Sequence, residues 1–210
     1  MKIMITAGPT REAIDPIRFI SNRSSGKMGY ALAQVAVNLG HQVSLISGPV
    51  NLKPPENLIL FKQIISSQDM FDAVIKHYCE NDLIIMCAAV ADYRPIHIET
   101  QKIKKNNNEL ILKLERTTDI LKYLGEHKRS GCVHIGFAAE TENLKENAIK
   151  KLKEKNADYI IANDVSSPIL GMSSDSNAVT IYRNDGDVHA IPCGLKGLIA
   201  EKILKYIFES

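Results

Sequence analysis

Hydrophobic and polar residues alternate along the chain in two patterns. Six short runs are almost continuously apolar, which is typical of strands covered on both faces; they span residues 2–6, 42–47, 57–62, 82–90, 132–140 and 158–164. Between and after them, apolar residues recur at the spacing of amphipathic helices, over residues 28–39, 69–79, 118–128, 142–156 and 195–208. This alternation predicts a doubly wound, Rossmann-like α/β fold, with a mostly parallel sheet between two layers of helices.

Two later segments do not follow this alternation. Residues 109–115 read as a further β segment, and residues 177–192 read as a β-hairpin that turns at Asp185-Gly186. The chain has no internal repeat and no low-complexity linker. We therefore expect one domain over residues 1–210, with a small β extension.

A long polar loop separates the first strand from the first helix. A dinucleotide-binding fold usually turns at once through GxGxxG, whereas residues 8–26 intervene here and end in Ser24-Ser25-Gly26-Lys27. The free N–H groups of the first helical turn carry positive partial charge, so this turn is a candidate cradle for a phosphate or a carboxylate. A serine N-cap with a glycine turn explains the same residues, and both interpretations remain open.

Further candidate residues follow later strands, at the edge where ligands bind in doubly wound sheets. The small Ala88 and Ala89 would let a ligand approach the backbone. Asp92 is a candidate for binding a ribose, a base amino group or a magnesium-bridged phosphate, or it simply closes an Asx turn. Phe137 is either a core residue or a wall against which a base packs.

Lysines occur in two places that suit an anionic ligand. The stretch KIKKNNN, 102–108, is either a solvated basic turn or a flap that brings a cation to a developing charge. Lys151 and Lys155 are four residues apart, so they share one face of a predicted helix and repel each other. Bound polyphosphate would relieve that repulsion, although a solvated face is the simpler explanation.

Composition narrows the choice of partners. The 210 residues are 45% hydrophobic and carry a formal net charge of +2, which suggests no nucleic-acid partner. No apolar run approaches the roughly 18 residues that span a bilayer, and the N-terminus lacks the features of a signal peptide. We expect a cytoplasmic protein without a membrane segment.

The sequence lacks the residue patterns that several common binding sites and reactions require. The four cysteines form no CxxC pair and no metal-ligand pattern, and we expect Cys87 and Cys132 to be buried thiols. The second strand ends SLISGPV, without the acid or arginine that would bind the ribose of a nicotinamide dinucleotide. The SGK triplet does not meet the P-loop pattern GxxxxGK[ST].

The motifs ITAGPTREAIDPIRFISNRSSGKMG, CAAVADYRP followed by KIKK, GFAAET and IIANDVS together resemble the phosphopantothenate–cysteine ligase family of coenzyme A biosynthesis. The resemblance runs from about residue 3 to residue 177. In most bacteria this ligase follows a flavin-dependent decarboxylase. Because this chain begins at the ligase's first strand, the resemblance implies a stand-alone ligase that needs no flavin.

The resemblance implies a reaction in two halves, of the bacterial type that uses CTP with Mg²⁺. The carboxylate of 4′-phosphopantothenate attacks the α-phosphate of CTP and releases pyrophosphate, and the amine of L-cysteine then displaces CMP from the acyl-cytidylate. It also implies a homodimer whose site is completed across the interface. The alternatives are an oxidoreductase of the same fold class that binds a nicotinamide dinucleotide, and a non-catalytic nucleotide-binding module.

The resemblance also assigns roles to residues. Asn22 would hold the acyl intermediate, Lys102 would supply a cation to the reacting phosphate, and Arg18 would support the site. Substrate binding is implied for Asn22, Ser25, Gly26, Ala88 and Ala89. Nucleotide binding is implied for Gly8, Asp92, Lys102, Asp119, Ile120, Phe137, Lys151 and Lys155, with no protein ligand for a metal.

Overall fold

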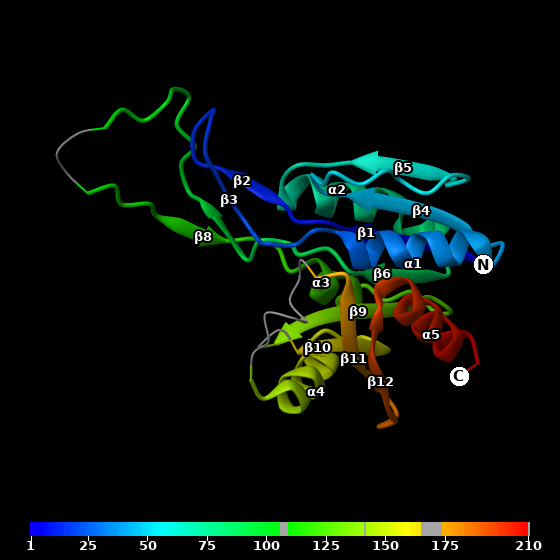
Figure 1. The fold of residues 1–210 in the computed structure, drawn as a ribbon. Helices are drawn as coiled ribbons and strands as arrows, with labels where there is room; N and C mark the ends of the chain where they lie inside the picture. Colours follow the sequence, from blue (N-terminus) through cyan, green and yellow to red (C-terminus); the bar gives the residue numbers. More distant parts are fainter. Residues whose placement is uncertain (106–108, 141, 165–173, 210) are drawn as a thin grey trace.

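One sheet forms the centre of the fold (Figure 1). The computed structural model describes residues 1–105, 109–140, 142–164 and 174–209. Within these residues, eight strands form the sheet in the order β12-β11-β10-β9-β6-β1-β4-β5. Their bounds are β1 (Lys2–Ala7), β4 (Gln42–Ser47), β5 (Leu60–Gln63), β6 (Leu83–Met86), β9 (Val133–Glu140), β10 (Tyr159–Asp164), β11 (Ser176–Arg183) and β12 (Val188–Leu195). The six strands from β10 to β5 in this order are parallel to one another. β11 pairs antiparallel with both β10 and β12, so the predicted sheet and hairpin are confirmed.

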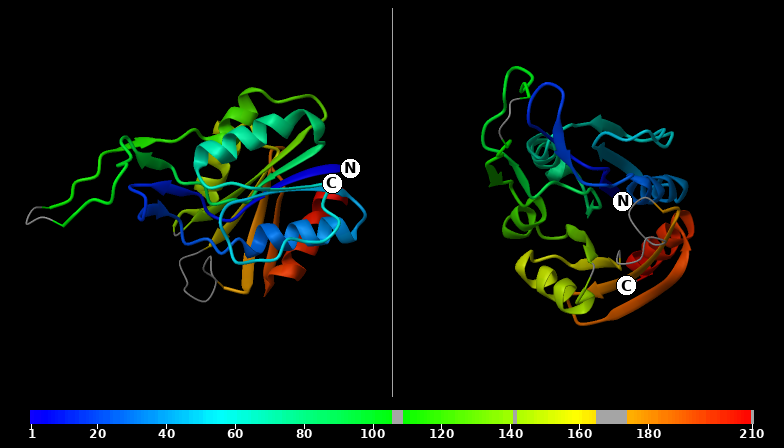
Figure 2. Two further views of the ribbon diagram at one scale, coloured as in Figure 1. Left: turned by 90° about the horizontal axis from the view of Figure 1, so that it is seen from above. Right: turned by 60° about the vertical axis from the view of Figure 1, so that its left-hand side comes forward.

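Helices cover both faces of this sheet, as the alternating pattern predicted. One face carries α1 (Lys27–Asn38) and α5 (Lys196–Glu209), whose apolar residues share one core cluster. The other face carries α2 (Ser67–His77), the 3-10 helix η1 (Tyr78–Glu80), α3 (Ile120–Glu126) and α4 (Leu144–Glu154). Figure 2 shows the two layers from above and from one side. No helix in the described part of the chain is long and apolar enough to cross a membrane.

The central strand β1 shows why its sequence is continuously apolar. Ile3 and Ile5 pack into the core under α1 and α5, whereas Met4 between them packs into the core on the other face. All three side chains are completely buried. Burying each one stabilises the fold by about 1.5–3 kcal/mol, so a polar residue on either face of this strand would be strongly unfavourable.

Some predicted boundaries differ from the observed ones. The strand predicted over 57–62 begins at Leu60, because Asn57 has a positive φ of 63° that a strand does not accommodate. The strand predicted over 82–90 ends at Met86. Of the β segment predicted over 109–115, only its end pairs, as β8 (Leu114–Arg116).

Two small antiparallel ladders were not predicted. β2 (Arg11–Ala13) pairs with β3 (Phe19–Ser21) inside the long polar loop, and β7 (Tyr93–Pro95) pairs with β8. We call the segment from β7 to β8, residues 93–116, the arm; its residues 106–108 lie outside the described residues. Figures 1 and 2 show that the arm and the β2–β3 hairpin project together from the end of the sheet where the parallel strands terminate.

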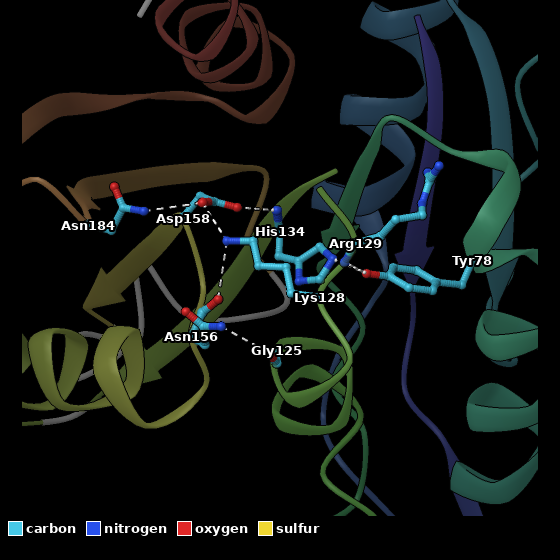
Figure 3. Close-up of polar contacts among 8 residues, drawn as sticks. All are labelled: Tyr78, Gly125, Lys128, Arg129, His134, Asn156, Asp158 and Asn184. Carbon is cyan, nitrogen blue, oxygen red and sulfur yellow. Dashed lines mark hydrogen bonds and ion pairs between the residues drawn. The ribbon is translucent and has the colours of Figure 1, made fainter. Parts of the chain in front are cut away.

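A polar cluster joins the elements at the opposite, amino-terminal end of the strands (Figure 3). The Asp158 carboxylate accepts hydrogen bonds from the His134 backbone N–H at 2.7 Å and from Lys128 Nζ at 2.6 Å. The Tyr78 hydroxyl lies 2.9 Å from His134 Nε2 and accepts from the backbone N–H of Arg129 at 3.0 Å. These bonds connect η1 and the loop before β9 with the loop before β10.

His134 is held neutral in this cluster. Its side chain is completely buried, and Nδ1 has no hydrogen-bond partner within the described ranges. Burial, and then the Lys128 charge, lower the pKa of His134 from 6.5 to about 4. The folded chain therefore resists a proton that the unfolded chain accepts readily.

We predict that this histidine makes the fold sensitive to acid. Its stabilising contribution is complete above about pH 6.5 and is lost as pH falls toward 4, because only the unfolded chain binds the proton in that range. At pH 5 the free energy of unfolding is lower by about 2 kcal/mol than at neutral pH because of this histidine. Thermal unfolding at pH 7 and pH 5 should show a smaller drop in Tm for His134→Gln than for the unchanged chain. Equal drops would contradict this assignment.

Candidate functional site

A cleft of about 450 Å³ opens at the carboxyl ends of the parallel strands. Residues from most of the separate motifs line it, although none comes from KIKK, 102–105; sequence spacing alone did not require this gathering. The lining includes the predicted Asn22, Ser25, Gly26, Ala88, Ala89, Asp92, Asp119, Ile120, Phe137, Lys151 and Lys155. The cleft is therefore the candidate site that the motifs share.

The first turn of α1 forms one wall of the cleft. Its N-cap is Gly26, with a left-handed φ of 76° and no side-chain cap, so the serine N-cap is not the arrangement adopted. Lys27, Met28 and Gly29 begin the helix and line the cleft. Their N–H groups come before the first intrahelical partner and carry the positive end of the helix dipole. An anion placed here would meet backbone donors.

A close contact places this helix against the sheet. A Cβ added to Gly29 would lie 2.6 Å from the Cβ of Ala7 in β1, a distance that carbon atoms do not adopt. The helix therefore packs on the end of β1 only because this residue is glycine. The first turn of α1 is thereby held at the carboxyl edge of the sheet.

The loop after β6 forms the opposite wall, and it is held by the end of β1 and by the loop that follows β1. The N–H of Ala88 donates to Thr6 Oγ1 at 3.1 Å, and the N–H of Ala91 donates to Thr10 Oγ1 at 3.0 Å. Asn22 adds to this contact, since its Nδ2 donates to the carbonyls of Ala89 and Val90, each at 3.1 Å. Both hydrogens of the Asn22 amide are thus used in orienting the wall.

Ion pairs set the charge at the far side of the cleft. Lys151 Nζ lies 2.6 Å from Glu140 Oε1, and Lys155 Nζ lies 3.1 Å from Asp119 Oδ2. The predicted repulsion between the two lysines is therefore balanced by a carboxylate beside each. Asp119 also caps α3, because its Oδ1 accepts from the Lys122 N–H at 3.0 Å. Asp92, in the segment after β6, is exposed and also lines the cleft.

Two apolar residues face the cleft between these charges. Ile120 is 3% exposed at the start of α3, and Phe137 is half-buried in β9. Phe137 packs against the core as well as lining the cleft, so both interpretations of this residue hold. A flat base or an alkyl chain would find an apolar surface here.

Further polar residues line the cleft that the sequence did not single out. Lys196 at the start of α5 is 8% exposed and Asn177 in β11 is 3% exposed. Asn163 in β10 also lines the cleft, and its buried Oδ1 has no hydrogen-bond partner in the part of the chain that the structure describes. Burial, and then the charge of Lys27, lower the pKa of Lys196. Asn163 lies within the quoted motif IIANDVS, although no role was assigned to it, whereas Lys196 and Asn177 gave no signal beyond a polar residue at a helix start or in an apolar strand.

Three predicted site residues lie outside the residues that line the cleft. Gly8 has a φ of 74°, and its carbonyl accepts from the Ala89 N–H at 2.9 Å, so it shapes the backbone beside Gly26. Arg18 in the β2–β3 hairpin pairs with Asp15, and Lys102 is exposed in the arm. The roles that the resemblance implies for them stay predictions.

The two cysteines that the sequence singled out lie in different surroundings. Cys132 is buried, as predicted, whereas Cys87 is only partly shielded and lines the cleft. Burial raises the pKa of the Cys87 thiol to about 12, so the thiol is protonated at neutral pH. Across the described ranges, no three histidine, cysteine, aspartate or glutamate side chains are grouped to hold a metal ion.

Comparisons with known proteins identify relatives of the whole chain. Residues 1–210 match the family model described as the DNA/pantothenate metabolism flavoprotein C-terminal domain. The coenzyme A biosynthesis bifunctional protein CoaBC of Bacillus subtilis (strain 168) is 48% identical over 205 residues, covering 98% of this chain and 50% of that protein. The CoaBC protein of Escherichia coli (strain K12) is 42% identical over 210 residues, covering 99% of this chain and 51% of that protein.

A solved structure agrees with these relatives. The crystal structure of the C-terminal domain of a CoaBC protein has a TM-score of 0.84 and 51% identity, and the match covers 98% of this chain and 93% of that one. The chain spans about half the length of the curated relatives that it matches. The family resemblance read from the motifs is confirmed, and the chain belongs to the DNA/pantothenate metabolism flavoprotein C-terminal domain family.

Proposed function

We propose that residues 1–210 are a single ligase domain that joins 4′-phosphopantothenate to L-cysteine, with CTP as the activating nucleotide. One observation carries the proposal: a single cleft combines the uncapped first turn of α1, the Asn22 amide and two lysines, in a chain of this family. The relatives named for coenzyme A biosynthesis supply the substrate class.

The first half-reaction needs cations, because a carboxylate must approach a polyphosphate of like charge. The oxygen of the phosphopantothenate carboxylate forms a bond to the α-phosphorus of CTP, and the bond to the departing pyrophosphate breaks. Lys151 and Lys155 lie where this charge builds up in the proposal. Partly exposed ion pairs contribute little net stability, so phosphate oxygens can replace Glu140 and Asp119 as their partners.

The second half-reaction transfers the acyl group to an amine. The cysteine nitrogen bonds to the acyl carbon, the bond to CMP breaks, and the ammonium proton leaves to solvent or to the departing phosphate. Asn22 and the first-turn amides of α1 are the neutral donors beside this step. For Asn22 to donate to the acyl oxygen, one of its bonds to the Ala89 or Val90 carbonyl must be exchanged.

The remaining partners are part of the same proposal. Mg²⁺ enters with CTP, and phosphate and water oxygens supply most of its ligands in such complexes. We assign it no protein ligand, and neither half-reaction uses a flavin. The reaction suits the cytoplasm, where the nucleotide is made available.

We also propose that the working form is a homodimer. Exposed apolar side chains along the arm support it: Ile96 is 59% exposed, Ile98 is 55% exposed and Ile111 is 78% exposed. Such residues on a projecting segment favour pairing with another surface. In a dimer, Arg18 and Lys102 can reach a cleft other than their own, which gives a role to two residues that do not line the cleft of their own chain.

Pyrophosphate release tests the function directly. We expect release with CTP and 4′-phosphopantothenate together, and not with either alone, because no acyl-cytidylate forms otherwise. Added L-cysteine should yield CMP and phosphopantothenoylcysteine, identified by mass spectrometry. The other three common triphosphates serve as controls. Binding of nucleotide without turnover of any triphosphate would leave a nucleotide-binding module instead.

Substituting Asn22→Asp should lower kcat about 100-fold, as loss of one oxyanion donor does elsewhere. A carboxylate cannot donate to the acyl oxygen, and it repels the carbonyls of Ala89 and Val90. Asn51→Asp makes the same charge change at an exposed residue and should retain full activity. Full ligation by Asn22→Asp would remove this residue from the mechanism.

Substituting Lys151→Gln should raise the KM for CTP about tenfold, since one phosphate contact is worth roughly 1.4 kcal/mol. Lys150→Gln is the matched control in the same helix, because Lys150 is exposed and reaches only toward Glu154. Steady-state kinetics at varied CTP would measure both. Equal KM values for the two variants would place the polyphosphate elsewhere.

A further inference from the structure

We infer that Asp15 is a positioning residue: its carboxylate holds the base of the arm and thereby places the neighbouring Lys102. The inference rests on the proposed function, in which Lys102 supplies a cation. Asp15 itself lies in the turn between β2 and β3 and is not among the residues that line the cleft.

The Asp15 carboxylate is completely buried and accepts five hydrogen bonds. Its Oδ1 accepts from the backbone N–H groups of Ile17 at 2.9 Å and of Arg18 at 2.8 Å. Its Oδ2 accepts from Arg18 Nε at 3.0 Å, from Arg18 Nη2 at 2.5 Å and from the backbone N–H of Ile103 at 3.1 Å. The side chain is 0% exposed, whereas that of Arg18 is 42% exposed.

One of these bonds leaves the hairpin. Ile103 is 88 residues further along the chain, in the arm, and directly follows Lys102. The carbonyl of Ile103 also accepts from Arg18 Nη2, at 3.2 Å. The Asp15–Arg18 pair therefore holds both the N–H and the C=O of one arm residue, and the Lys102 backbone is joined to it by the peptide bond.

A second bond supports the same contact. The N–H of Glu99 donates to the carbonyl of Ile14 at 3.0 Å, so the arm touches the hairpin at two places four residues apart. The side chain of Lys102 stays exposed between them. The backbone of this short arm segment is held, while the ammonium group remains available.

The groups around Asp15 explain why a carboxylate occupies this position. All five groups around it are donors, so an acceptor-only side chain with two oxygens satisfies them. The bonds from Arg18 lower the pKa of Asp15 well below its ordinary value, and the backbone N–H groups add to the effect. An asparagine would turn an NH₂ group toward Arg18 and Ile103 and lose their bonds, while its oxygen could still serve Ile17.

A purely local role would not need the arm. Closing the β2–β3 turn requires only the bonds to Ile17 and Arg18, which lie two and three residues from Asp15. The hydrogen bond from the Ile103 N–H to Asp15 adds nothing to that turn, but it fixes the position of the Lys102 backbone. The arm has another ion pair, Arg94 with Glu115 at 2.8 Å, that does not touch this segment and offers a matched control.

The test compares Asp15→Asn with Glu115→Gln in the full chain, by limited trypsin digestion and by ligase kinetics. Trypsin cleavage after Lys102, Lys104 and Lys105, followed by mass spectrometry of the fragments, should be about tenfold faster in Asp15→Asn. Its kcat should fall about tenfold while the KM for CTP stays within about twofold. Glu115→Gln should match the unchanged chain in both measurements.

Ile103→Pro gives a second variant that leaves the Asp15–Arg18 pair intact. It removes the N–H that donates to Asp15. Because trypsin does not cleave before proline, this variant should show faster cleavage after Lys104 and Lys105, together with lower kcat, if Asp15→Asn does not fold. Unchanged cleavage in both variants would overturn the inference, as would faster cleavage with unchanged kcat. If the unchanged chain shows no ligase turnover, the proposed function fails, and cleavage alone then decides whether Asp15 holds the arm.

Discussion

The cleft depends on hydrogen bonds between two loops that follow neighbouring parallel strands. The end of β1 and the loop after it supply the acceptors, which are the hydroxyls of Thr6 and Thr10 and the Gly8 carbonyl, and the loop after β6 supplies the backbone donors of Ala88, Ala89 and Ala91. Thr6 and Thr10 are completely buried, so these bonds are shielded from water. Such a contact replaces the sheet ladder where the strands end, and it keeps small residues with an exposed backbone facing the ligand. Without it, neither Asn22 nor the first turn of α1 would face a defined wall.

The two ends of the sheet serve different purposes. At the amino end, buried groups such as Asp158 and His134 satisfy one another and tie loops together (Figure 3). At the carboxyl end, polar groups are left facing a cleft, and one buried oxygen of Asn163 has no partner among the described residues. Buried polar groups are normally paired, so an unpaired one beside a cleft is the arrangement expected where a ligand completes the bonding.

The sequence predicted the sheet well because each buried strand has a run of apolar residues that reports burial on both faces. The same pattern could not reveal β2 and β3, whose three residues each are too short to show a period. The site residues were predicted through the family motifs, and the cleft gathers most of them. What the sequence could not supply were the partners: Glu140 beside Lys151, Ile103 beside Asp15, and Lys196 and Asn177 in the cleft wall. The contact between Asp15 and Ile103 joins residues 88 positions apart, which only the fold brings together, whereas Glu140 and Lys151 are eleven positions apart on consecutive elements whose relative placement the sequence pattern does not give.

The two lysine–carboxylate pairs imply a threshold for ligand entry. Because Lys151 and Lys155 are each already neutralised, a lone phosphate that displaces one carboxylate exchanges one partner for another and gains little. A chain of linked phosphates can bind both lysines at once. When its second phosphate replaces the second carboxylate, the ligand loses no further translational freedom, because it is already bound. In the proposed reaction the nucleotide is split into two fragments. Each fragment then competes alone with a carboxylate that is tethered to the chain, so the binding of each fragment is weaker than that of the intact nucleotide. Under the proposed function, the cleft would therefore discriminate by the number of connected charges and would release the separated products.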